Sequence, residues 1–158
     1  MGRLFTLFFC LVVTAMLLPA TGSLAVGQDT PVYTHFLYMF AHDGWLHYSV
    51  NAVAFLVMHH VYSRWRWVAA YLSAVAASFW LENDRLVVGA SVLLCFFVGC
   101  IAPVMWKRRR LLFWQTVAIL LIQCFIPYIA GMWHLVMMLF GLVYIAMERI
   151  VSDIRHNI

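Results

Sequence analysis

Charged residues are scarce in this sequence. Lysine, arginine, aspartate and glutamate together make up 10% of its 158 residues, whereas 66% are hydrophobic and the mean hydropathy is +0.92. A soluble domain is typically about 25% charged, and so apolar a chain would expose too much apolar surface to stay in water. The composition therefore excludes a soluble globular domain and places the chain in a lipid bilayer. It gives no indication of nucleic acid as a partner.

Motifs for metals and cofactors are also missing. The four cysteines lie inside apolar runs and form no CxxC pair, which argues against a disulfide framework and a zinc motif. The histidines show neither HxxxH nor HExxH spacing, and no glycine-rich loop suited to phosphate is present. We therefore expect no metal and no cofactor.

Six apolar stretches are separated by short polar segments. They run from about residue 4 to 19, 44 to 61, 67 to 81, 86 to 106, 111 to 126 and 131 to 147. A helix that crosses a bilayer needs roughly 20 apolar residues, so the sequence predicts an all-α, six-span bundle that forms one domain, residues 1–158. Alternatively, the first stretch is a signal peptide cleaved near Ser23-Leu24-Ala25, which would leave five spans.

The basic residues indicate the orientation of this bundle, because lysine and arginine stay on the cytoplasmic side of a membrane. With the N-terminus inside, only Arg85 among the ten basic residues lies outside. The other nine are Arg3, Arg64, Arg66, Lys107, Arg108, Arg109, Arg110, Arg149 and Arg155. We expect a multi-pass protein of the inner (plasma) membrane with both termini in the cytoplasm.

Four polar side chains lie inside the apolar stretches near their outer ends. Such groups are costly in lipid, so each is a candidate site residue. His47 and Asn51 are four residues apart and share a helix face. Ser91 lies six residues beyond Arg85, and His134 lies seven residues beyond Pro127. At 1.5 Å per residue, all four lie within about 12 Å of the outer boundary, so three spans bring them to a similar depth.

These residue types suit acyl transfer. A serine hydroxyl is a weak nucleophile until a base takes its proton, and histidine can do so near neutral pH. The oxyanion that follows needs preorganised donors, which an asparagine amide, a histidine ring N–H and a backbone N–H supply. All six carboxylates lie in loops, in the tail or at span ends, so we expect a Ser-His dyad rather than a Ser-His-Asp triad. The alternative is a structural role, because a serine or histidine in a membrane helix can form hydrogen bonds within that helix or with a neighbouring helix. We expect His42, at the start of the second stretch, to pack in the loop.

The residues also match a known pattern. The stretch His42 to Asn51 resembles the HxxxxHxxxN signature in the second helix of rhomboid intramembrane proteases. Gly89-Ala90-Ser91, with Gly99 eight residues after the serine, is similar to the GxSG motif of their fourth helix, and His134 with Gly141 resembles their sixth-helix histidine. The order of the motifs, the number of stretches and the expected orientation agree with that family over essentially the whole chain.

The resemblance implies a serine endopeptidase that cuts transmembrane segments of other membrane proteins near the outer membrane face, without metal or ATP. It makes Ser91 the nucleophile and His134 its base, and it assigns His47 and Asn51 to the oxyanion site. The loop between the first two spans would cap the cavity that admits water.

The chain departs from the family pattern at several positions. These are Val92 in place of the last glycine of GxSG, Cys95 in place of a frequent tyrosine, Trp133, and Met137 in place of a small residue. Bulk at Val92 and Met137 faces the contact between the fourth and sixth stretches. A catalytically inactive rhomboid-like protein that binds transmembrane helices therefore remains an alternative, as does an unrelated transporter or structural bundle.

Overall fold

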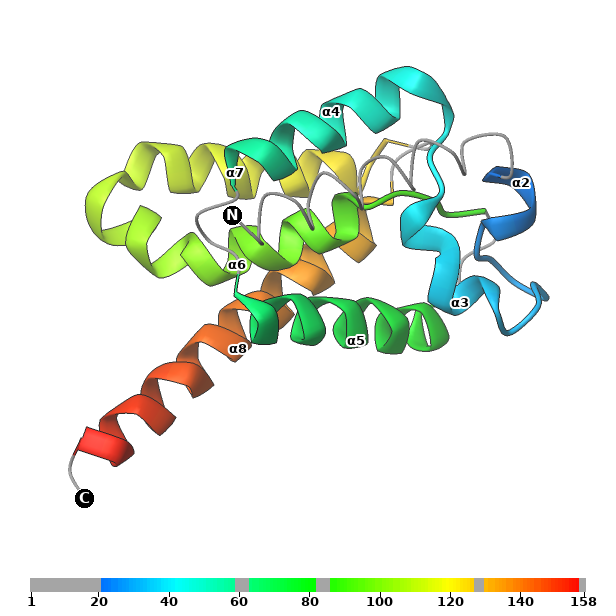
Figure 1. Cartoon of the computed structure of the whole chain (residues 1–158). Helices are drawn as coiled ribbons and strands as arrows, with labels where there is room; N and C mark the ends of the chain where they lie inside the picture. The colour runs from blue at the N-terminus through cyan, green and yellow to red at the C-terminus, as the bar shows by residue number, and fades with distance from the viewer. Residues whose placement is uncertain (1–20, 59–62, 82–85, 127–129, 157–158) are drawn as a thin grey trace.

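The computed structural model describes residues 21–58, 63–81, 86–126 and 130–156; the first apolar stretch lies outside these residues. The described part is built almost entirely from helices (Figure 1). In chain order they are α2 (Thr21–Leu24), α3 (Thr34–Leu37), the 3-10 turn η2 (Tyr38–Phe40), α4 (Gly44–Val57), α5 (Arg64–Trp80), α6 (Ser91–Arg108), α7 (Arg110–Gln123) and α8 (Gly131–His156).

The prediction of a six-span bundle is wrong. Within the described residues, only α6 and α8 are long and apolar enough to cross a membrane. Helices α4 and α7 have 14 residues each and α5 has 17, which corresponds to about 21–26 Å at 1.5 Å per residue. A hydrocarbon core is about 30 Å thick. The prediction failed because every apolar run was counted as a span whatever the length of its helix: the run 67–81 has only 15 residues, and in the run 111–126 the helix ends at Gln123, before a turn at residues 124–126.

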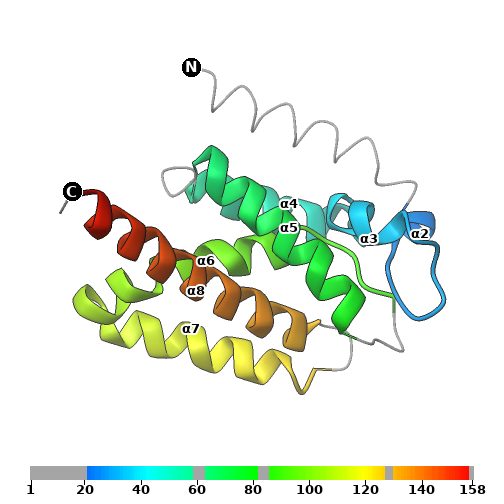
Figure 2. The same ribbon diagram turned by 90° about the horizontal axis from the view of Figure 1, so that it is seen from below.

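The two long helices form the centre of the structure and run in the same direction. In Figures 1 and 2, α6 passes through the middle of the bundle, and α8 lies between α5 and α7 before its C-terminal end projects away from the other helices. Two glycines allow this close packing: a methyl group on Gly99 would overlap the backbone of Met138 in α8, and one on Gly141 would overlap the carbonyl of Phe96 in α6. Small residues at such contacts are typical of helix pairs in membranes.

Large apolar side chains cover much of the outer surface. On α4 they form a stripe with helical spacing at Leu46, Val50, Val53 and Val57. On α8 a second stripe consists of Leu139, Val143, Met147, Ile150 and Ile154. Apolar surface of this extent marks contact with another apolar phase or partner, and together with the two long apolar helices it is compatible with association with a membrane.

The segment before α6 is extended rather than helical, which corrects the expected start of the fourth stretch at Leu86. Val87 forms an isolated antiparallel bridge with Val26, through two backbone hydrogen bonds of 3.0 and 2.7 Å. Gly89 has a φ of +116°, a conformation that residues with a side chain rarely adopt, and its N–H donates to the carbonyl of Tyr38 at 3.0 Å. Ser91 is therefore the first residue of α6 instead of lying inside a longer helix.

The loop between residues 25 and 43 packs into the bundle and fixes this segment. Tyr38, Met39, Ala41 and His42 are buried, and the Tyr38 hydroxyl donates to the carbonyl of Ala74 in α5 at 3.0 Å. Because the loop binds α5 on one side and residues 87–89 on the other, it holds the beginning of α6 in place.

Candidate active site

Ser91 and His134 meet where α6 and α8 begin. Ser91 Oγ lies 2.9 Å from His134 Nε2, a hydrogen bond between residues 43 positions apart. His134 is buried, whereas Ser91 is half-buried. The parallel course of the two helices and the Gly99–Gly141 contact about two turns further on bring these first turns together. The pair thus has the geometry in which a histidine can take the proton of a serine hydroxyl.

His47 approaches the same place from α4. A Cβ atom added to Gly89 would lie 2.6 Å from His47 Cε1 and 2.8 Å from Nε2, so the imidazole packs directly on the Gly89 backbone. The N–H of Asp43 donates to His47 Nδ1 at 3.3 Å. Because Nδ1 accepts this bond, the neutral ring carries its proton on Nε2, the nitrogen that faces Gly89. His47 can therefore donate a hydrogen bond next to Gly89, two residues before Ser91.

Asn51 lies one turn beyond His47 on α4 and is only 4% exposed. Among the described residues its side-chain nitrogen has no hydrogen-bond partner. A buried amide donor left without a partner costs free energy, so an unsatisfied donor is held beside His47 on the same helix. The backbone N–H of Ser91 is a further donor, because the first amides of a helix have no acceptor within it.

His42, which the sequence assigns to loop packing, is buried with 1% exposure. Its ring stacks edge-on against His47 and Tyr48, with centroids 5.1 and 5.6 Å apart, and its Nε2 accepts a hydrogen bond from the N–H of Ala90 at 3.5 Å. Burial, with a smaller contribution from nearby His47, lowers the pKa of His42 from 6.5 to about 4. The neutral ring thus supports both His47 and the residue before Ser91.

The structure adds one residue that the sequence analysis missed. Gln123, the last residue of α7, places its Oε1 2.9 Å from His134 Nδ1. The available signal was the position of this amide inside an apolar run, near the end that leads to His134. Polar residues at such positions are candidate site residues by default. Gln123 was overlooked because it lies only four residues before Pro127, where the run was expected to end.

No protein family, characterised protein or solved structure gives a significant match to this chain. In the described part of the chain, no group of three or more histidine, cysteine, aspartate or glutamate side chains is arranged to hold a metal ion.

The bulky residues that depart from the rhomboid pattern do not keep Ser91 and His134 apart. Val92 and Met137 are both buried, at 1% and 0% exposure, and belong to one core cluster. Trp133 is buried edge-on against Tyr38, with ring centroids 5.4 Å apart. The large side chains thus fill space beside the helix contact, and close approach occurs at the two glycines.

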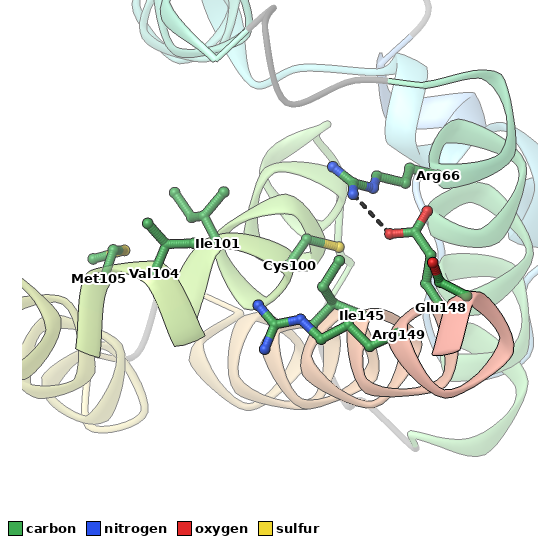
Figure 3. A pocket seen from close by; sticks show the side chains of 9 residues that line it. Arg66, Cys100, Ile101, Val104, Met105, Ile145, Glu148 and Arg149 are labelled. Atoms are coloured by element: carbon green, nitrogen blue, oxygen red, sulfur yellow. Dashed lines mark hydrogen bonds and ion pairs between the residues drawn. The ribbon is translucent and has the colours of Figure 1, made fainter. Parts of the chain in front are cut away.

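A separate cavity of about 710 Å³ lies near the other end of α6. Figure 3 shows Arg66 of α5 pointing toward Glu148 of α8, and the two form an ion pair of 2.7 Å. Cys100 also lines this cavity and donates to the carbonyl of Gly141 at 3.5 Å. The polar groups here tie α5 and α6 to α8 and do not pair a nucleophile with a base, so the candidate active site remains at the Ser91 end.

Proposed function

We propose that this chain is an intramembrane serine endopeptidase that resembles the rhomboid proteases. It cleaves transmembrane segments of other membrane proteins near the outer membrane face. The observation that carries this proposal is the 2.9 Å hydrogen bond between Ser91 Oγ and His134 Nε2. The donors on His47, on Asn51 and at the start of α6 support it, because acyl transfer needs hydrogen-bond donors beside the nucleophile.

In the proposed reaction, Ser91 Oγ attacks the carbonyl carbon of the scissile bond while its proton passes to His134 Nε2. The negative charge on the former carbonyl oxygen is stabilised by the His47 Nε2–H, the Asn51 amide and the Ser91 N–H. The C–N bond then breaks, and His134 gives the proton to the leaving amine. Water then attacks the acyl-enzyme carbonyl while His134 Nε2 takes its proton. The bond between the acyl carbon and Ser91 Oγ breaks, and His134 returns the proton to Ser91 Oγ.

The proposed orientation follows from the basic residues. Because α6 and α8 run in the same direction, the end of α6 at Lys107 and Arg108 and the end of α8 at Arg155 lie on one side. Lysine and arginine favour the cytoplasm, so we place these ends inside and Ser91 on the outer side of the plasma membrane. Arg3 favours the cytoplasm for the N-terminus as well.

A serine-directed fluorophosphonate probe tests the proposal. The purified protein should become covalently labelled, and both Ser91→Ala and His134→Ala should abolish labelling, because an unassisted serine is a poor nucleophile. Ser49→Ala, which removes the hydroxyl of an exposed α4 residue close to His47 in sequence, is the control and should label normally. A protein that binds transmembrane peptides but is never labelled would be the inactive rhomboid-like alternative.

A further inference from the structure

We infer that Gln123 is a positioning residue for the dyad: its side-chain oxygen holds His134 in the tautomer that can accept the proton of Ser91. This inference rests on the proposed function for its catalytic meaning. The interaction itself is a property of the folded protein that can be measured without any substrate.

The two hydrogen bonds of His134 define the tautomer. Gln123 Oε1 lies 2.9 Å from Nδ1, and Ser91 Oγ lies 2.9 Å from Nε2. A carbonyl oxygen can only accept, so Nδ1 must carry the ring proton and Nε2 is left with a lone pair. The Ser91 hydroxyl then donates to Nε2. In the other tautomer Nε2 would carry the proton, so His134 could not accept the proton of Ser91. Its Nδ1 would then face Gln123 Oε1 with no hydrogen between these two acceptors, which is unfavourable.

The contact between α7 and α8 holds Gln123 at this position. A methyl group on Gly131 would overlap the backbone of Gln123 and Cys124, so the start of α8 lies directly on the end of α7. One turn from Gln123 and His134, the buried side chains of Leu120 and Met138 belong to a common cluster. Backbone contact on one side and apolar packing on the other therefore fix the amide opposite the ring.

A neutral amide suits this place. In a Ser-His-Asp triad the aspartate keeps the histidine in the correct tautomer and orientation, but an ionised carboxylate is costly in an apolar setting. An amide oxygen supplies the same acceptor without a net charge. Three other helices place polar side chains near His134. Ser91 of α6 and Gln123 of α7 form hydrogen bonds with its ring, and His47 of α4 is the titratable group that interacts with it electrostatically.

The first test is kinetic. Gln123→Met keeps the length of the side chain but removes the acceptor, and it should lower kcat roughly 3- to 10-fold, the range for one neutral hydrogen bond, with KM unchanged. Gln123→Glu keeps an acceptor and should retain most of kcat. It should also move the acid limb of the pH profile of kcat/KM to higher pH, because a carboxylate stabilises the protonated imidazole. Gln115→Met and Gln115→Glu, at an exposed position of the same helix, are the matched controls.

The second test is ¹⁵N NMR of imidazole-labelled protein, with the His134 signals assigned by their loss in His134→Ala. The parent should show the Nδ1–H tautomer of His134, and Gln123→Met should show a mixture. A parent spectrum with the Nε2–H tautomer would overturn the inference. It would also be overturned if the Gln123 variants matched the Gln115 controls in both their kinetics and their His134 tautomer. If the parent shows the Nδ1–H tautomer but Ser91→Ala cuts as fast as the parent, the proposed function fails, while the hydrogen bond by which Gln123 fixes the tautomer of His134 stands.

Discussion

The contact between Gly89 and His47 gives a sharp prediction. In Gly89→Ala the new Cβ would lie 2.6 Å from His47 Cε1, so the imidazole has to retreat by about 0.8 Å to reach an ordinary contact of 3.4 Å. A misplacement of about 1 Å can cost roughly 10²-fold in rate, and complete loss of an oxyanion donor costs roughly 10²–10³. We therefore expect kcat to fall by about 10²-fold.

The substitution also strains the backbone, because the φ of Gly89 is +116°. Such strain costs about 1–3 kcal/mol and has to be separated from the displacement of His47. Gly44→Ala is the matched control: Gly44 has a φ of +81°, but a Cβ at this position meets nothing within 4 Å. Gly22→Ala, at an open position without a positive φ, controls for the methyl group itself.

The assay is cleavage of a purified transmembrane test substrate by each variant, with thermal unfolding measured in parallel. Gly44→Ala should lose stability but retain kcat, and Gly22→Ala should change neither. If Gly89→Ala cuts as fast as Gly44→Ala, then His47 does not serve the reaction from its position beside Gly89, and the assignment of this residue to the oxyanion site is refuted.

Three further predictions concern other parts of the fold. Gly141→Ala should push α8 away from the Phe96 carbonyl, lowering both the unfolding temperature and activity, whereas an alanine at exposed Val143 should do neither. Because the pKa of His42 falls from 6.5 in the unfolded chain to about 4 in the fold, stability should decrease as the pH falls from 6.5 towards 4. Denaturant titrations should show a smaller decrease for His42→Gln. A reporter fused after Arg110 should report the cytoplasm, and a periplasmic signal would contradict the proposed orientation.

The sequence predicted the residues of the site better than the arrangement of the helices. Ser91 and His134 could be paired because both are polar groups in apolar runs at a similar distance from a polar boundary, and the structure brings them together. Asn51 and His47 share a face of α4 as their spacing requires, and His47 packs on Gly89 in the segment before Ser91. Whether these residues act in catalysis stays a prediction.

The parts that were missed depend on tertiary contacts. Within residues 86–90, Gly89 is the one local signal against a helix that leads into Ser91. The segment is extended because Val87 pairs with Val26, which lies far away in the sequence. Hydropathy therefore misplaced the start of α6. It also overestimated the number of spans, because the apolar runs of α4, α5 and α7 fold into helices of only 14, 17 and 14 residues. Gln123 was missed for a related reason: its partner His134 is eleven residues away, across the α7–α8 connection.

The central claim is that Ser91 is a nucleophile activated by His134. The most direct measurement is the cleavage rate of a transmembrane test substrate by purified Ser91→Ala, with thermal unfolding recorded to show that the variant is folded. Loss of the hydroxyl should abolish cleavage and leave the fold intact, since Ser91 is half-buried and its side chain fills little space. If folded Ser91→Ala cuts as fast as the parent protein, Ser91 is a packing residue and the chain is not a serine protease of this kind.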